Sequence, residues 1–308
     1  MTARNPMHRS SRALPSHCSN STISGGVDTD LVRVGGVAIG TFRCPATWPS
    51  FRDTGPISEC LIAFPRTGVW ICHQGSRRFL ADPTIITMYN RGQRYERFVA
   101  SPDGDRCDWF AIDEAIAREI VSAFDERAGE SERPFRFEWA PSSMSLYLKQ
   151  RAVVRRASRG ALDRLGSQEA VIHIVAAAIA LAYARRAEPR VRRPDARTRR
   201  REIVEATRAA LLSTVRENTS VHTLAAIVGT SPYHLCRVFR ASTGRTLLEY
   251  RNELRVRIAL ELLERRTAEA ATLSAIAHDL GFSSHAHFVL AMRRSAAATP
   301  SAIRALVG

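Results

Sequence analysis

The sequence predicts an α+β protein: an N-terminal antiparallel β barrel or sandwich, followed by helices, and then an all-α C-terminal domain with two helix-turn-helix units. Three observations support this fold class. Short apolar segments separated by turn residues occupy residues 30–112, apolar residues recur at helical spacing after residue 112, and one helix–glycine–helix pattern occurs twice near the C-terminus. At 308 residues, the chain has room for two domains.

The N-terminal part reads as a series of short strands. Segments of four to six apolar or β-branched residues lie between clusters of Gly, Pro and Asp, such as Asp82-Pro83 and 101–104. The expected strands are 31–34, 61–64, 68–72, 84–89 and 109–112. Short strands at this spacing are typical of antiparallel barrels and sandwiches.

Helical periodicity follows in residues 113–127, 143–157 and 167–186. The third segment is almost wholly apolar between residues 170 and 184, so it must be buried on most faces, either in the core of its own chain or in a seam between subunits. This apolar run has 15 residues, fewer than the about 18 that suggest a membrane helix, and we expect no membrane partner. If the helix pairs two subunits, residues 27–190 form a dimer that Ile174→Glu or Ile179→Glu disrupts.

The segment before the C-terminal domain is polar and contains Pro189 and Pro194, which is typical of a linker. The sequence therefore divides into a disordered tail (1–26), a sensor or dimerisation domain (27–187), a linker (188–200) and a DNA-binding domain (201–308). The tail is rich in Ser, Arg and Asn and lacks the apolar segment of a signal peptide.

The first helix-turn-helix unit turns at Gly229, which can adopt the left-handed conformation that ends a helix. Ser231 is suited to cap the next helix and Pro232 to begin it. The helical period places Leu235, Val238 and Phe239 on the inner face. The outward face then carries the candidate DNA contacts Tyr233, His234, Cys236, Arg237 and Arg240, and Arg237 is the best candidate for a bidentate contact to guanine.

The second unit turns at Gly281, 52 residues after Gly229. Its recognition helix is expected to begin at Ser283 and Ser284, with Phe288, Ala291 and Met292 facing inward. The candidate DNA contacts of this unit are Ser283, Ser284, His285, Ala286, Val289 and Arg293. His287 and Leu290 also face outward, so this surface has few long hydrogen-bonding groups and should contribute less base readout.

Between the units, residues 247–266 form one helical pattern of roughly 30 Å. One turn of DNA is about 34 Å long, so this helix could hold two reading heads in successive major grooves. His285 and His287 do not indicate a metal site, because residues two apart lie about 200° apart around a helix. We expect neither a metal nor a cofactor.

Charge identifies the expected partner. The chain has a formal net charge of +15, and residues 190–308 contribute 20 Arg against 10 Asp and Glu. A basic domain with two such units predicts double-stranded DNA as the ligand. The six cysteines are scattered without Cys-x-x-Cys pairs, which is typical of a protein from the reducing cytoplasm.

Residues 201–306 resemble the DNA-binding domain of the AraC/XylS family of bacterial transcription regulators. The residues that carry the resemblance are Ser231-Pro232, Leu235, Phe239, Thr243-Gly244, Tyr250, Arg255, Ala259, Leu262-Leu263, Ile276-Ala277, Gly281 to Ser284, His287-Phe288 and Thr299 to Ser301. The resemblance implies that Tyr233, Cys236 and Arg237 face bases, as do His285, Ala286 and Val289. The chain departs from the family pattern at Leu290, where Arg or Lys is usual, and at Ala296-Ala297, where Phe-Gly is usual.

The N-terminal part resembles the cupin-like sensor domains of the same family at residues 64–68, 81–83 and 89–92. The two resemblances together imply a cupin-like barrel with a pocket, a small-molecule effector, a homodimer and RNA polymerase as partners. His73 is the only histidine between His17 and His173, so the multi-histidine cluster of enzymatic cupins is missing.

We therefore expect a cytoplasmic, sequence-specific transcription regulator and no enzyme. Two alternatives from other classes stand beside this interpretation. One is a metal-dependent cupin enzyme fused to a DNA-binding domain, which bound metal would reveal. The other is a nonspecific DNA-packaging protein, which would bind all sequences with similar affinity. Cys72 and Cys107 could act as redox-sensing thiols, although buried structural cysteines are commoner.

Overall fold

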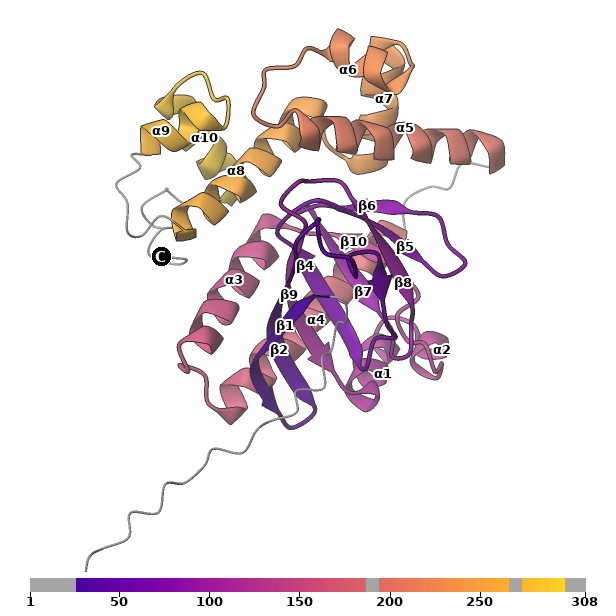
Figure 1. The fold of residues 1–308 in the computed structure, drawn as a ribbon. Helices are drawn as coiled ribbons and strands as arrows, with labels where there is room; N and C mark the ends of the chain where they lie inside the picture. Colours follow the sequence, from indigo (N-terminus) through magenta and orange to yellow (C-terminus); the bar gives the residue numbers. More distant parts are fainter. Residues whose placement is uncertain (1–25, 187–193, 266–272, 297–308) are drawn as a thin grey trace, which may run out of the picture.

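The computed structural model describes residues 26–186, 194–265 and 273–296, which form two domains stacked on each other (Figure 1). The β domain lies below, and the helices of the C-terminal part lie across its top in the view of Figure 1. The expected disordered tail falls outside the described residues except for Gly26, as do residues 188–193 of the expected linker and the motif residues from Ala297 onward.

In the described part of the chain, ten strands form two antiparallel sheets. They are β1 (Val27–Val34), β2 (Val37–Cys44), β3 (Asp53–Thr54), β4 (Cys60–Pro65), β5 (Val69–His73), β6 (Phe79–Ala81), β7 (Ile85–Tyr89), β8 (Tyr95–Val99), β9 (Asp105–Ile112) and β10 (Trp139–Pro141). The larger sheet has the order β1-β2-β9-β4-β7-β10, and the smaller sheet has the order β3-β8-β5-β6. All five expected strands are present, and the antiparallel β architecture of the N-terminal domain is confirmed.

Side chains fill most of the space between the sheets. The core there includes Leu61, Val69, Phe79 and Trp109, each at most 1% exposed. The expected strands did not include β2, β3, β6, β8 and β10. In β2, Gly40 interrupts the apolar pattern. Gly40 pairs with Trp109 across the ladder, and a Cβ atom at residue 40 would lie 2.2 Å from the Trp109 ring. The missing side chain therefore makes room for the indole.

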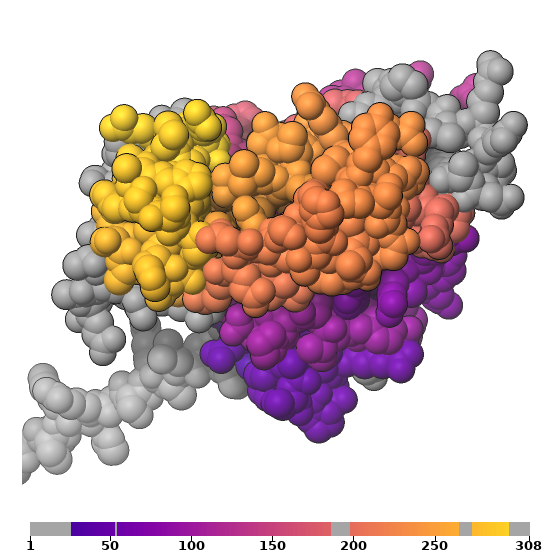
Figure 2. Space-filling view, turned by 90° about the horizontal axis from the view of Figure 1, so that it is seen from above, coloured from indigo at the N-terminus to yellow at the C-terminus, as the bar shows by residue number. Residues whose placement is uncertain are grey.

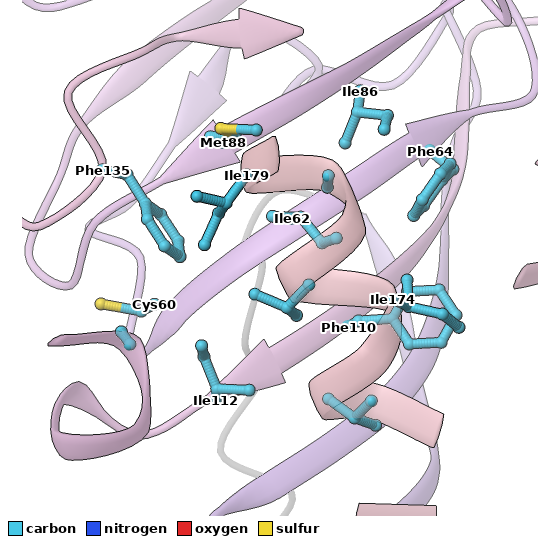
Figure 3. Close-up of a cluster of buried hydrophobic side chains, with 14 of the residues drawn as sticks. Cys60, Ile62, Phe64, Ile86, Met88, Phe110, Ile112, Phe135, Ile174 and Ile179 are labelled. Carbon is cyan, nitrogen blue, oxygen red and sulfur yellow. The ribbon is translucent and has the colours of Figure 1, made fainter. Parts of the chain in front are cut away.

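Four helices complete the N-terminal domain: α1 (Glu114–Ser122), α2 (Glu126–Gly129), α3 (Met144–Ser158) and α4 (Arg164–Arg186). Helix α4 packs on the outer face of the larger sheet, with Ile174 and Ile179 pointing at the strands (Figure 3). These two side chains are 4% and 2% exposed, so the expectation that they pair two subunits is wrong. They belong to the core of their own chain.

By length and composition, helix α4 could cross a membrane. The apolar run inside it, residues 170–184, is shorter than a membrane helix needs. In this fold, the apolar residues of α4 pack against the larger sheet. The side of the helix that carries Val171, Val175 and Ala178 covers the larger sheet, where all three are completely buried.

The described residues of the C-terminal part form six helices: α5 (Pro194–Ser213), α6 (Val221–Val228), α7 (Pro232–Thr243), α8 (Leu247–Arg265), α9 (Leu273–Asp279) and α10 (His285–Ala296). Helix α5 begins at Pro194, whereas the sequence pattern placed the end of the linker at residue 200. Proline fits the first turn of a helix because the backbone N–H it lacks would have no partner there.

A buried polar cluster joins α5 and α8 to the β domain. The Asp82 carboxylate, which is completely buried, accepts hydrogen bonds from Arg208 Nη2 at 3.0 Å and from the Tyr250 hydroxyl at 2.7 Å. Arg208 also pairs with Glu205 at 3.2 Å, and Glu205 accepts the backbone N–H of Leu80 at 2.8 Å. Because buried charges are stable only when paired, this cluster defines how the two domains dock.

A second ionic cluster lies at the other end of α8. Arg66 donates to both carboxylate oxygens of Glu261 at 2.6 Å and to Glu264 at 2.9 Å. Arg151 bridges the same helix to the sheet, with contacts of 3.0 Å to Glu264 and 2.6 Å to Asp108. The two clusters hold both ends of α8 against the β domain.

His73 is buried at the end of β5 among aromatic rings. Its side chain is 3% exposed, and its Nδ1 atom lies 2.7 Å from the amide nitrogen of Gln93. The rings of Phe79, Tyr89 and Tyr95 lie 5.1 to 6.1 Å away between centroids. Loss of hydration lowers the pKa of His73 from 6.5 to about 4, so the folded protein holds a neutral imidazole at physiological pH.

This shift predicts a loss of stability in acid. Between pH 6.5 and 4, the unfolded chain binds a proton at His73 and the folded chain does not, so the free energy of unfolding falls as pH falls. The shift corresponds to about 3 kcal/mol over this window. We expect His73→Gln to flatten the pH dependence measured by urea unfolding. His173→Gln, which changes an exposed histidine, should keep the wild-type slope, and an equally steep slope in His73→Gln would contradict the prediction.

Candidate nucleic-acid interface

The first helix-turn-helix unit consists of α6, a turn at Gly229 and α7. Gly229 has φ +71° and ends α6 in the left-handed conformation that glycine adopts at low cost. The Ser231 hydroxyl accepts the backbone N–H of His234 at 3.3 Å, and Pro232 occupies the first turn of α7. This cap, worth about 1 kcal/mol, fixes where the recognition helix begins.

The two faces of α7 are separated as the sequence predicts. Leu235, Val238 and Phe239 are at most 4% exposed and pack in a core with α5, α6 and α8. The predicted contact residues on the opposite side are exposed or half-buried: Tyr233, His234, Cys236, Arg237 and Arg240. Tyr233 is 79% exposed, and Arg237 Nη2 lies 3.4 Å from His234 Nδ1.

The second unit repeats this arrangement with α9, a turn at Gly281 and α10. Gly281 has φ +73°, and the Ser284 hydroxyl accepts the backbone N–H of His287 at 3.1 Å. Phe288, Ala291 and Met292 are buried. The predicted contact residues Ser283, Ser284, His285, Ala286 and Arg293 are exposed, and Val289 is half-buried.

The two units lie side by side on the surface turned away from the β domain. Figure 2 shows this surface, with α9 and α10 in yellow beside the orange helices of the first unit. Helix α8 connects the units, and its 19 residues span about 28 Å. The structure therefore presents two exposed recognition helices at the ends of one connecting helix.

Residues 224–305 match the family model described as a helix-turn-helix domain. These residues therefore form a helix-turn-helix domain. An 81-residue segment, 26% of the chain, is 38% identical to the HTH-type transcriptional regulator GlxA of Rhizobium meliloti (strain 1021). The match spans about a quarter of that relative, 24% of its length.

The chain is also similar to solved structures. ToxT from Vibrio cholerae O395 is 13% identical with a TM-score of 0.33, over 83% of this chain and 92% of that chain. An AraC-type transcriptional regulator from Chromobacterium violaceum is 27% identical with a TM-score of 0.31, over 38% of this chain and 97% of that chain.

The two recognition helices of this domain differ in chemistry. The outward surface of α7 carries two arginines, an imidazole and a phenol, all of which can donate hydrogen bonds to DNA. On α10, the outward surface has the donors His285 and Arg293, but it also includes Ala286, the half-buried Val289 and Leu290, which is 45% exposed. His287 is held at the start of the helix, where its Nδ1 atom lies 3.1 Å from the Ser283 hydroxyl. The outward surface of α10 therefore has a larger share of apolar side chains than that of α7.

The sequence pattern did not reveal the roles of the arginines on α8. Arg251, Arg255 and Arg257 are basic residues interspersed among the apolar residues of this helix. In the structure, Arg255 and Arg257 are 1% and 0% exposed and bind carbonyl groups of other segments. Arg255 and Arg257 are two residues apart and so lie on nearly opposite sides of α8, which means that helical spacing alone could not predict that both are buried.

The β domain offers a small cavity between its sheets, lined in part by Thr87, Tyr89, Tyr95 and Cys107. Cys107 is buried, and desolvation raises its pKa well above the usual value for a thiol. A thiol in this state is a poor nucleophile, so Cys107 has the character of a structural cysteine. Among residues 26–186, 194–265 and 273–296, no group of three His, Cys, Asp or Glu side chains is arranged to hold a metal ion.

Proposed function

We propose that this protein is a sequence-specific transcription regulator that binds double-stranded DNA through both helix-turn-helix units. The observation that carries the proposal is the pair of exposed, serine-capped helices α7 and α10 held on one surface by α8. Helices of this kind enter the major groove with their outward side chains at the base edges. The match of this domain to a transcription regulator supports the same conclusion and favours it over the enzyme interpretation.

Within this proposal, α7 supplies most of the base contacts. Arg237 has the long, forked donor group that matches the two acceptors of guanine, and Tyr233, His234, Cys236 and Arg240 share its surface. On α10, the proposed contacts are Ser283, Ser284, His285, Ala286, Val289 and Arg293. The basic residues of both helices add contacts to phosphates, which strengthen binding without selecting sequence.

The β domain has the proposed role of sensing a signal or pairing two subunits. Its direct docking on α5 and α8 gives it a physical connection to the DNA-reading units. A small-molecule effector and RNA polymerase are the remaining proposed partners, and the cytoplasm is the proposed compartment. The AraC-type domain supports these proposals only by family resemblance.

Selection of DNA by the purified protein tests the proposed function. Full-length protein is incubated with random duplexes, and the DNA that it retains is sequenced. We expect this DNA to be enriched in a motif of two elements about 10 base pairs apart. Retention of all sequences in equal measure would instead indicate a nonspecific DNA-packaging protein.

Substitution of Arg237 tests the proposed base contact. Arg237→Ala should weaken binding to the selected motif by about 1 to 3 kcal/mol while nonspecific binding persists, because one base contact is lost and most phosphate contacts remain. Titration on cognate and random duplexes measures both affinities. Arg133→Ala, which removes an exposed arginine from the β domain, is the control and should change neither. Equal weakening on both duplexes would refute the base contact.

We also propose a homodimer that pairs the outward side of α4. The inner side of this helix is buried in the domain, but Ile172, Ala176, Ala177, Ala180 and Ala184 on the opposite side are exposed or half-buried. Small side chains allow two helices to approach closely. An apolar surface of this kind is costly to leave in water, so a second copy of α4 is the proposed occupant.

Light scattering of the full-length protein tests this dimer. We expect a dimer at micromolar concentration that Ala176→Glu or Ala180→Glu converts to a monomer, because the new carboxylates would be buried against the partner helix. Ala206→Glu, at an exposed alanine of α5, is the matched control and should remain dimeric. A monomeric wild-type protein would show that the α4 surface pairs with nothing.

A further inference from the structure

Arg255 lies near the middle of α8 and contacts segments that belong to both helix-turn-helix units. Its Nε and Nη2 atoms donate to the carbonyl oxygens of Val215 at 2.7 Å and Glu217 at 2.8 Å, in the segment that leads into α6. Its Nη1 atom donates to the carbonyl oxygen of Gly281 at 2.9 Å, in the turn of the second unit. One guanidinium therefore connects the entrance of the first unit to the turn of the second.

The surroundings of Arg255 leave little freedom for this connection. The side chain is 1% exposed, and its guanidinium lies 5.4 Å from the centre of the Phe282 ring. A Cβ atom at Gly281 would lie 2.3 Å from the Arg216 carbonyl oxygen and 2.6 Å from Arg255 Nη2, so the two units meet almost backbone to backbone. Arg216 adds a longer contact of 3.4 Å to the carbonyl oxygen of Asp279.

The geometry of the guanidinium suits this connection. Its donors point in fixed, different directions within one plane, which lets a single group serve carbonyls on two segments. A lysine ammonium is one point of charge on a flexible stem, so it could not serve Val215, Glu217 and Gly281 together. Carbonyl groups left without donors in this buried place would favour a shift of one unit against the other.

Two recognition helices read DNA together only if their separation matches the duplex. The heads must lie in successive major grooves, about 34 Å apart and in phase with the helical repeat. A small rotation of one unit against the other would change the base-pair spacing at which both can bind.

We propose that Arg255 is a positioning residue that fixes the angle between the two helix-turn-helix units and thereby sets the spacing of the two DNA elements that the protein reads. The proposal rests on the proposed function, because it requires that both units bind DNA. It assigns to Arg255 a role in specificity without contact to DNA.

A spacing series tests this role. The selected DNA motif is prepared with its natural spacing and with one base pair added or removed, and the dissociation constant is measured for each duplex. Wild-type protein should bind the altered duplexes at least about fivefold more weakly, the loss expected for one mismatched contact. The spacing ratio is the dissociation constant for an altered duplex divided by that for the natural one. In Arg255→Lys, this ratio should fall below about twofold, because the second unit can then bind at either spacing.

The control is Arg251→Lys on the same helix. Arg251 donates to the Thr219 carbonyl oxygen at 3.2 Å, on the side of the first unit, and its change should keep the wild-type ratio. If Arg255→Lys weakens all duplexes by the same factor and keeps the ratio, Arg255 only stabilises the fold and the proposal is overturned.

A second variant covers the case in which Arg255→Lys does not fold, as judged by circular dichroism. Arg216→Ala removes the exposed contact to Asp279 and should lower the ratio in the same direction by a smaller factor. An unchanged ratio in this variant would then overturn the proposal. A wild-type protein that selects a motif but tolerates every spacing would refute the positioning role alone, whereas the absence of any selected motif would refute the proposed function itself.

Discussion

The arrangement of the whole molecule depends on charges buried between the β domain and α8. Asp82 has no exposure to water, and it accepts hydrogen bonds from Arg208 and Tyr250 of the C-terminal part. At the same boundary, Arg257 is completely buried and donates to the Ser142 carbonyl oxygen at 2.6 Å. Breaking one such buried pair costs about 3 to 5 kcal/mol, so a shifted docking is strongly disfavoured. The helix that joins the DNA-reading units is thus also the helix that the β domain holds.

Local patterns in the sequence were sufficient to locate the recognition helices. The glycine turns, the serine caps and the spacing of Leu235 and Phe239 all act within one or two helical turns, and the structure places each as expected. The five expected strands were found for the same reason. Strand β2 was missed because the benefit of Gly40 depends on Trp109, which is 69 residues away in the chain and adjacent only in the folded sheet.

Long-range pairing explains what the sequence could not predict. The apolar composition of α4 required burial, but composition does not show which side of a helix meets which neighbour. The structure places Ile174 and Ile179 in the domain core and leaves Ala176 and Ala180 on the other side. Likewise, nothing in the sequence separates Arg208 and Arg257 from the surface arginines of this basic chain. Their partners, Asp82 and Ser142, lie far away in the sequence and belong to the other domain.

Helix α8 both joins the two helix-turn-helix units and docks on the β domain, and this restricts how the protein can diversify. A regulator whose domains are joined only by a tether can exchange its reading module for another by simple recombination. Here a transplanted module would need the docking residues Tyr250, Arg257 and Glu261 as well as its own recognition helices, and the recipient would need carboxylates and arginines at matching places. Changes of operator are therefore expected to arise through substitutions on the outward sides of α7 and α10, while the two halves of the chain are inherited together.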